Sequence, residues 1–266
     1  MKILLVVPEI RLDSHPTNIP FWAGIFGSIA EQKGHQIGIL DLNALRMNFN
    51  NQLVPDEFIK NEILSEKWDL IGIGGLTSTY ARIKYLCKII KKKGENQMSI
   101  NLIANGETSF ENINGLCLRN NETFVFTNPR ALIDDLDKVP YPNYDLLELD
   151  IYFRYSALPY SKESFMAKRR LSTVWERGCP RGCTFCSHNG MSRIDLQNIY
   201  GDGDRKQGEK LVRISDKENN TFQLPARWPS PKYAVENIRL LKEKYNIDFF
   251  MAVDENMTSN KKWTEE

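Results

Sequence analysis

Three cysteines stand close together at Cys179, Cys183 and Cys186, in the stretch C-P-R-G-C-T-F-C with the spacing C-x3-C-x2-C. Soft thiolate ligands on one loop are typical of iron–sulfur sites, and three of them can face a single metal centre. Because no fourth cysteine is near, a four-iron cluster held there would keep one iron free of protein ligands. An open iron can bind a substrate or cofactor, so the spacing predicts chemistry as well as structure.

Two other interpretations of these cysteines stay open. Together with His188 they could form a closed Cys3His zinc site that stabilises a scaffold, although zinc ligands usually come as two separated pairs. The three thiols could also carry no metal at all. The crowding of all four side chains into ten residues, His188 included, favours the iron–sulfur hypothesis.

Composition narrows the class of protein. The chain has 266 residues, of which 41% are hydrophobic and 26% charged, with a formal net charge of +1. These values are ordinary for a globular protein with a buried core, and they give no electrostatic reason to expect nucleic acid or a membrane surface as partner. No apolar run approaches the roughly 18 residues of a membrane span. Five cysteines, three of them clustered, favour a reducing cytoplasm over a secreted disulfide framework.

The first part of the chain alternates strand and helix patterns. Strands are predicted at Lys2–Val7, Gln36–Asp41, Leu70–Gly74 and Ser99–Ala104, and helices at Phe21–Lys33, Asp56–Lys67 and Thr79–Lys93. This order predicts an α/β fold with a Rossmann-like, doubly wound parallel sheet. No G-x-G-x-x-G follows the first strand, so a nicotinamide dinucleotide is not expected.

The pattern changes after residue 112. Two short strands, Gly115–Arg119 and Glu122–Thr127, suggest a hairpin, and an acidic stretch with two prolines follows as a linker. A second βα unit begins with a strand at Leu171–Glu176. Its later elements are a hairpin around Leu211–Ile214, a helix at Ser230–Tyr245 with Ser230 as its cap, and a strand at Ile247–Val253. We therefore expect a domain at 1–112, a hairpin and linker at 113–165, and a third region at 166–266 with an insertion at 190–228.

The stretch from Trp175 to Cys186 resembles the signature of radical S-adenosylmethionine (SAM) enzymes, C-x3-C-x-aromatic-C after the first strand of a (β/α) barrel. The resemblance implies a [4Fe-4S] cluster on the three cysteines and SAM at the open iron. It also implies reductive cleavage of SAM to a 5′-deoxyadenosyl radical, with electrons from a donor such as flavodoxin or ferredoxin. Phe185 would pack over the cluster and approach the adenine of SAM.

The residues after the second predicted barrel strand extend this resemblance. Asp254, Glu255 and Asn256 stand where the family has a short polar motif that holds the methionine amino group. A carboxylate is a suitable partner for an ammonium group. The alternative is that these three residues form an ordinary turn at the exit of a strand.

The order of parts is similar to that of the cobalamin-binding subfamily, in which a Rossmann-like domain precedes the barrel. That similarity implies a corrinoid and radical methylation, rearrangement or cyclisation of a small-molecule or natural-product-like substrate. The expected cobalamin contacts are Thr77, Ser78, Thr79, Asn105 and Gly106. The three hydroxyl residues also open a predicted helix, so helix capping is the alternative. His15 is the candidate cobalt ligand, in a loop that resembles D-x-H-x-x-G but ends in Asn18, and a surface histidine is its alternative.

The chain departs from this subfamily in two places. After the fourth predicted strand it reaches the hairpin almost at once, so the corrinoid domain is expected to be shorter by one βα unit. A full barrel needs about 250 residues, whereas fewer than 100 follow Leu171. The chain is therefore expected to be truncated or to be completed by a partner, and a non-catalytic iron–sulfur or corrinoid-binding module is the alternative to an enzyme.

Overall fold

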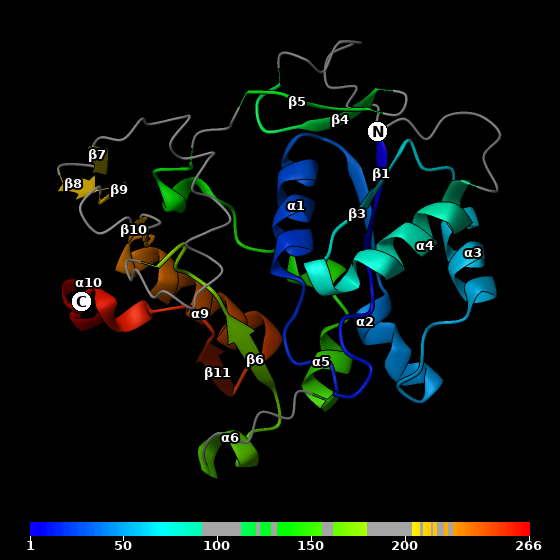
Figure 1. Cartoon of the computed structure of the whole chain (residues 1–266). Helices are drawn as coiled ribbons and strands as arrows, with labels where there is room; N and C mark the ends of the chain where they lie inside the picture. Colours follow the sequence, from blue (N-terminus) through cyan, green and yellow to red (C-terminus); the bar gives the residue numbers. More distant parts are fainter. Residues whose placement is uncertain are drawn as a thin grey trace. The chain divides into compact units, whose positions relative to one another are not determined.

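The computed structural model describes residues 1–91, 113–120, 123–128, 132–155, 162–179, 204–207, 210–213, 215–216, 221–222 and 226–266 (Figure 1). The chain divides into two units, each built from separate stretches of sequence. Unit 1 comprises Met1–Asn101, Val139–Thr173 and Asn237–Met251. Unit 2 comprises Leu102–Lys138, Val174–Glu236 and Ala252–Glu266. The domain limits expected from the sequence stay a prediction.

Unit 1 contains a three-stranded parallel sheet in the order β2-β1-β3, with β1 (Lys2–Val7) between β2 (Gln36–Asp41) and β3 (Leu70–Ile73). Figure 1 shows helices on both sides of this sheet. Its connecting elements are α1 (Phe21–Gln32), α2 (Leu42–Leu45), η1 (Arg46–Phe49), α3 (Asp56–Leu64), η2 (Thr77–Thr79) and α4 (Tyr80–Lys91).

The side chains of β1 alternate between two buried layers. Val6 packs in a cluster with Ile59 of α3 and Leu86 of α4. Leu5 points the other way and packs in a cluster with Ala23 of α1. Because a central parallel strand is covered on both faces, its sequence is a continuous apolar run instead of an alternating one.

A third buried cluster in unit 1 joins segments that lie far apart in sequence. It includes Tyr144, Tyr152, Leu171 and Leu241, all nearly or completely buried. Tyr144 belongs to η4 (Tyr144–Leu146), and Tyr152 to α5 (Leu149–Tyr155). The residues that follow the proline-rich stretch thus form part of a core. A further short helix, α6 (Lys162–Met166), follows in the chain.

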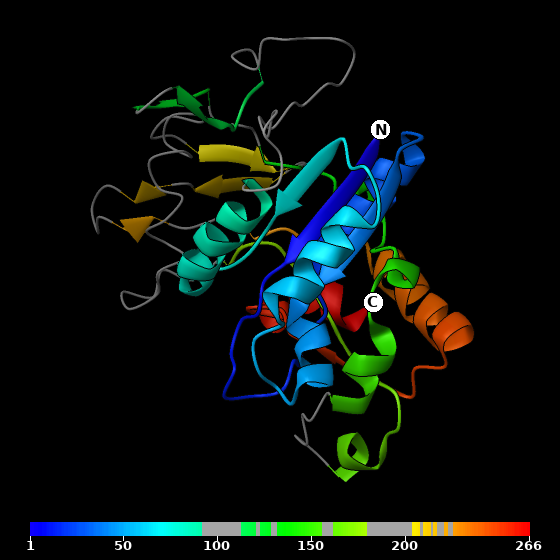
Figure 2. The same cartoon turned by 90° about the vertical axis from the view of Figure 1, so that its right-hand side faces the viewer.

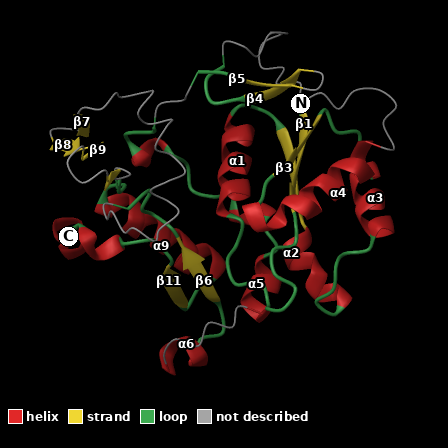
Figure 3. Cartoon of the chain, viewed as in Figure 1, coloured by secondary structure: helices red, strands yellow, loops and turns green. Residues whose placement is uncertain are grey.

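Strands β6 (Arg170–Thr173) and β11 (Phe249–Ala252) form a two-stranded sheet (Figure 3). Just before β11, Asp248 accepts hydrogen bonds from the backbone N–H groups of Lys168 and Arg169, both at 2.9 Å. Just after β11, Asp254 accepts one from Trp175, which follows β6, at 2.7 Å. The entries and the exits of the strands are therefore tied pairwise, and the strands run in the same direction. Helix α9 (Pro231–Tyr245) precedes β11. The partial barrel expected from the sequence stays a prediction.

Unit 2 contains short antiparallel strand pairs (Figure 2). The pairs are β4 (Cys117–Asn120) with β5 (Thr123–Phe126), β7 (Asp204–Gln207) with β8 (Lys210–Arg213), and β9 (Ser215–Asp216) with β10 (Thr221–Phe222). The other short elements are η3 (Leu136–Lys138), η5 (Met257–Ser259) and α10 (Lys261–Glu265).

Most elements predicted from the sequence are present with shifted ends. Both predicted hairpins are confirmed, and the predicted helices of unit 1 end one to three residues earlier than expected, the third of them also beginning one residue later. Because helix ends fray and capping geometry decides them, such shifts are ordinary. The predicted strand Ser99–Ala104 lies outside the described residues. In the part of the chain that the structure describes, no helix has the length and apolar character needed to cross a membrane.

Candidate functional site

In unit 2, a short backbone bridge lies directly before the first cysteine of the predicted cluster site. Arg177 and Arg227 exchange two backbone hydrogen bonds of 2.9 Å each, as an isolated antiparallel bridge. Gly178 follows with a φ of 83°, a left-handed conformation that glycine adopts without steric cost. Cys179 comes next, with a partly buried thiol that forms no disulfide. The bridge closes the base of the segment that holds the cysteines and the predicted insertion.

Cys179 is the one member of the predicted cluster site whose position is described. Cys183, Cys186 and Phe185 lie outside the described residues, as do Asn105 and Gly106 of the expected cobalamin contacts. Among the described residues, no group of three or more His, Cys, Asp or Glu side chains is arranged to hold a metal ion. The cysteine trio therefore stays a prediction.

Asp254, expected to bind SAM, ties the two strand exits together. Its Oδ1 accepts hydrogen bonds from the backbone N–H groups of Trp175, at 2.7 Å, and of Glu176. Its Oδ2 is buried and has no hydrogen-bond partner among the described residues. One oxygen of this carboxylate thus has a structural role, whereas the other remains available to accept a hydrogen bond.

Glu176 is the functional candidate that sequence reasoning missed. Its side chain is buried, with 4% of the residue exposed. Oε2 accepts a hydrogen bond of 2.8 Å from the backbone N–H of Asn256, whereas Oε1 is buried without a partner in the described part of the chain. The available signal was an acidic residue three positions before the first cysteine, in a stretch interpreted only as the end of a strand.

Burial and mutual repulsion both act on these carboxyl groups. Burial raises the pKa of Glu176, and the nearby charges of Asp254 and Glu255 raise it further, against the hydrogen bond from Asn256. Burial also raises the pKa of Asp254, and it lowers that of the Arg177 guanidinium. The charge of Arg177 acts against burial and lowers the pKa of Asp254. A carboxylate oxygen that is buried without a hydrogen-bond donor is costly, and each of these two side chains keeps one. The site is therefore suited to a positively charged group.

The other two residues of the expected SAM motif differ in exposure and use. The Glu255 side chain is exposed. Asn256 contributes its backbone N–H to the Glu176 carboxylate. The structure thus brings Asp254 and Asn256 to Glu176, while the Glu255 side chain reaches solvent.

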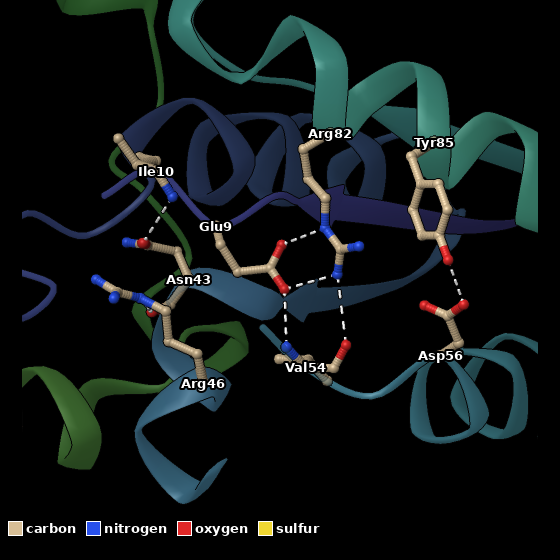
Figure 4. Close-up of polar contacts among 8 residues, drawn as sticks. All are labelled: Glu9, Ile10, Asn43, Arg46, Val54, Asp56, Arg82 and Tyr85. Atoms are coloured by element: carbon tan, nitrogen blue, oxygen red, sulfur yellow. Dashed lines mark hydrogen bonds and ion pairs between the residues drawn. The ribbon is translucent and has the colours of Figure 1, made fainter. Parts of the chain in front are cut away.

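The carboxyl end of the unit 1 sheet holds a second candidate region, centred on Glu9, which stands two residues after the end of β1 (Figure 4). Arg82 of α4 binds the Glu9 carboxylate with two hydrogen bonds of 2.8 Å, and the Val54 backbone N–H donates a third at 3.0 Å. The Glu9 side chain is 1% exposed and that of Arg82 13%. This paired buried charge holds the loop after β1 against α4 and the residues before α3.

Polar residues after β2, two of them buried, fix the rest of that loop. Asn43 accepts a hydrogen bond of 3.1 Å from the Ile10 backbone N–H (Figure 4). Arg46, 1% exposed, donates to the Ser14 carbonyl at 2.7 Å. Asn51 donates to the Leu12 carbonyl at 3.0 Å. The loop from Glu9 to Ser14 is thus held in one conformation by side chains from its neighbour.

The residues of unit 1 that were expected to contact cobalamin differ in their exposure and in their hydrogen bonds. His15 is exposed and lies edge-on to the Tyr155 ring, with ring centroids 5.6 Å apart. Thr79 is buried, and its hydroxyl donates to the Leu76 carbonyl at 2.7 Å, which is a local contact at the start of α4. Ser78 is exposed, and Thr77 lies in η2. This contact is not a helix cap, because a capping side chain accepts from a backbone N–H whereas the Thr79 hydroxyl donates. Ligand contacts by these residues stay a prediction.

Comparisons by sequence place methyltransferases among the relatives of this chain. No protein-family model matches. An uncharacterized methyltransferase of Pyrococcus horikoshii is 24% identical over 301 residues, covering 98% of this chain and 55% of the relative. Cytidylyl-2-hydroxyethylphosphonate methyltransferase of Streptomyces wedmorensis is 21% identical over 330 residues, covering 97% and 55%. The chain thus spans about half the length of the curated relatives it matches.

Comparison by structure identifies the same fold in a solved enzyme. Two structures of the radical SAM methyltransferase TsrM from Kitasatospora setae match 97% of this chain and 48% of theirs. The one with tryptophan and a SAM analogue bound has a TM-score of 0.52 at 12% identity. The one with cobalamin and a [4Fe-4S] cluster bound has a TM-score of 0.53 at 14% identity. The chain therefore has a mixed α/β fold shared with a radical SAM methyltransferase, and it is similar in sequence to methyltransferases.

Proposed function

We propose that this chain carries the cofactor-binding half of a cobalamin-dependent radical SAM methyltransferase that acts on a small molecule. In this proposal Cys179, Cys183 and Cys186 hold a [4Fe-4S] cluster, and SAM binds at its open iron. The observation that carries the proposal is the pair of carboxylates, Glu176 and Asp254, each of which keeps one buried oxygen without a partner among the described residues. Their open oxygens fit the ammonium group of an amino-acid-like ligand.

The donor set of the loop also fits the cluster. Thiolates at this spacing are iron ligands, and Gly178 lets the chain turn directly before the first of them. The bridge between Arg177 and Arg227 fixes where the loop begins. When bound, the cluster, SAM and a corrinoid supply the methyl-transfer chemistry, while the protein binds, orients and shields them.

The corrinoid is assigned to the carboxyl end of the unit 1 sheet, where open α/β sheets bind ligands. The loop from Glu9 to Ser14 is fixed there by buried polar contacts. Leu76 and Tyr80 follow β3 and are 56% and 63% exposed, so apolar surface is available for a macrocycle. Thr77, Ser78, Asn105 and Gly106 are the proposed polar contacts, with His15 as a proposed cobalt ligand. An electron donor such as flavodoxin or ferredoxin, and a reducing cytoplasm, belong to the same proposal.

Anaerobic reconstitution with iron and sulfide tests the cluster. The parent chain is expected to bind about four irons and to lose them when Cys179, Cys183 or Cys186 is replaced by alanine. Cys117 is exposed and distant from the motif in sequence, so Cys117→Ala is the matched control and is expected to keep the iron. Zinc without iron in the purified protein, or full iron in Cys183→Ala, would refute the assignment.

The corrinoid is tested separately. Incubation with hydroxocobalamin followed by gel filtration is expected to leave the visible absorption of the corrinoid on the protein. Replacing Leu76 and Tyr80 with glutamate puts charge on the proposed apolar surface and is expected to release it. Retention of the corrinoid by that double variant would move the site elsewhere, without affecting the iron result.

A further inference from the structure

The hairpin of β4 and β5 in unit 2 (Figure 1) exposes apolar side chains on both of its faces. Phe126 is 75% exposed and Val125 is 43% exposed. Because successive side chains of a strand point to opposite faces, these two neighbours lie on different sides of the hairpin. A two-stranded hairpin by itself is at best marginally stable in water, whereas a sheet of three or more strands with an apolar face is stable. Further strands beside β5 would extend the hairpin to such a sheet.

The outer edge of β5 has hydrogen-bonding groups that no described strand uses. In the part of the chain that the structure describes, β5 pairs with β4 alone. The Thr127 backbone N–H donates to the Leu116 carbonyl at 2.9 Å. Since alternate residues of an antiparallel strand turn their N–H and C=O groups to the same edge, those of Val125 also face β4. The N–H and C=O groups of Phe124 and Phe126 therefore face the outer edge.

The sequence along this edge is symmetric. Residues 123–127 read T-F-V-F-T, which is the same in both directions about Val125. If two copies paired antiparallel about a two-fold axis at Val125, Phe124 of each copy would stand opposite the partner's Phe126, and the terminal threonines would stand opposite each other. Aromatic pairs and threonine pairs in such positions are favourable. Because the outward N–H and C=O groups belong to the phenylalanines, each aromatic pair would also exchange two hydrogen bonds.

This edge lacks the features that usually keep strand edges apart, which are charged side chains, proline and bulges. Residues 123–127 contain no charged residue, no proline and no glycine. Two copies would therefore bring no like charges together along the paired segment. Pro129 stands two residues beyond the segment, and because proline cannot donate to a strand ladder, it limits how far the pairing extends. A two-fold pairing uses the same edge of both copies, so it closes as a dimer.

We propose that the outer edge of β5 is the interface through which two copies of this chain associate. The resulting sheet is antiparallel and four-stranded, in the order β4-β5-β5-β4, with its two-fold axis at Val125. The second copy is the occupant that this edge fits, because residues 123–127 are complementary to themselves. The inference goes beyond the proposed function and does not rest on it, since it involves neither the cluster nor SAM.

Disulfide crosslinking tests the register. In the proposed pairing the two copies of Val125 form a non-hydrogen-bonded pair with Cα atoms about 4.5 Å apart, which is a distance that a disulfide can bridge. Val125→Cys is made in a Cys117→Ala background, which removes the exposed native thiol of the hairpin. Mild oxidation is expected to give a covalent dimer. Peptide mapping by mass spectrometry should then show position 125 of one copy joined to position 125 of the other.

Asn128→Cys in the same background is the matched control for crosslinking. Asn128 is exposed and lies three residues beyond Val125. In the proposed pairing the two copies of position 128 are six residues apart along the strands, which is about 20 Å. The same oxidation is therefore expected to leave the two copies of position 128 unlinked.

Analytical ultracentrifugation tests the association itself. The parent is expected to sediment as a dimer at high protein concentration and to dissociate on dilution. Phe126→Lys is expected to weaken the dimer by about tenfold or more, because it removes two symmetric aromatic pairs and puts a charge on each edge. Since Phe126 is largely exposed, the circular dichroism and thermal midpoint of this variant should match those of the parent. Phe165→Lys is the control, because Phe165 of α6 is 70% exposed in unit 1, and it should keep the parent dissociation constant.

Three outcomes would overturn the inference. A parent that sediments as a monomer at every concentration, with no link at position 125, would show that two copies do not meet at this edge. A dimer that Phe126→Lys leaves intact would have its interface elsewhere. Assemblies larger than a dimer would contradict a pairing that closes about a two-fold axis. Iron binding by the cysteines is measured separately, so none of these outcomes changes the test of the proposed function.

Discussion

Tyr152 donates a hydrogen bond of 2.7 Å to Asp41 Oδ2, across 111 residues of sequence. Asp41 ends β2, is completely buried, and also accepts a hydrogen bond of 3.0 Å from the Ala44 backbone N–H. This contact joins the sheet of unit 1 to α5, which lies within the region 113–165 that was expected to be a hairpin and linker. It also places a carboxyl group where burial outweighs its hydrogen bonds and raises its pKa from 3.8 to about 6.

The pKa of Asp41 predicts a pH-dependent stability. Between the unfolded value of 3.8 and the folded value of about 6, the folded chain binds more protons than the unfolded chain. Stability is therefore fully present below that window and falls as the pH rises through it, by at most about 3 kcal/mol. Asp41→Asn removes the titrating group and so lacks this loss. The urea midpoint of the variant minus that of the parent should therefore increase from pH 4 to pH 7. A constant difference would contradict the assignment.

The ion pair between Glu9 and Arg82 is expected to be needed for the fold of unit 1. Arg82→Met leaves the Glu9 carboxylate buried without its counter-charge, and removing one partner of a buried pair costs about 3–5 kcal/mol. The double variant Glu9→Gln/Arg82→Met should recover part of that loss. Urea denaturation followed by circular dichroism measures both values.

A surface pair provides the control for this measurement. Lys2 and Glu66 form an ion pair of 2.7 Å with side chains 43% and 49% exposed. Because exposed pairs contribute about 0–1 kcal/mol, Glu66→Gln should change the stability little. Equal losses of stability for Arg82→Met and Glu66→Gln would show that burial does not make the Glu9–Arg82 pair more important for stability than an exposed pair.

Gly74, directly after β3, is expected to tolerate no side chain. A Cβ there would lie 2.4 Å from Trp22 Cζ2. Gly74→Ala should destabilise the chain by about 1–3 kcal/mol through overpacking. In a Trp22→Leu background the same substitution should cost less, and thermal denaturation of the four proteins measures that coupling. Strict additivity of the two substitutions would contradict the predicted contact.

Ser230 is expected to stabilise α9 as its cap. Its hydroxyl oxygen accepts a hydrogen bond of 3.1 Å from the Tyr233 backbone N–H, and Pro231 occupies the first helical position. Ser230→Ala should cost about 1 kcal/mol, whereas Ser230→Asn keeps an acceptor and should cost a few tenths. Comparison of their thermal midpoints tests the cap, and equal losses for both would refute it.

The sequence by itself determined the elements whose periodicity is strong. The apolar run of β1, the helices that alternate with the strands, and the Ser230-Pro231 start of α9 were all predicted, because local preference and burial point to the same structure there. The spacing of Cys179, Cys183 and Cys186 also gave the functional hypothesis, because metal-ligand chemistry depends on residue types that stand close together in the sequence. Cys183 and Cys186 lie outside the described residues, and the role of all three cysteines stays a prediction.

Tertiary structure alone decided which polar residues meet. Nothing in the local sequence of Glu176 indicates that the Asn256 backbone, 80 residues later, will bind one of its oxygens. Likewise, Asp41 and Tyr152 become partners only because α5 packs against the end of β2. Such contacts depend on which chain segments become neighbours, and a carboxylate reveals whether it is structural or free for a ligand only when its burial and its remaining donors are known.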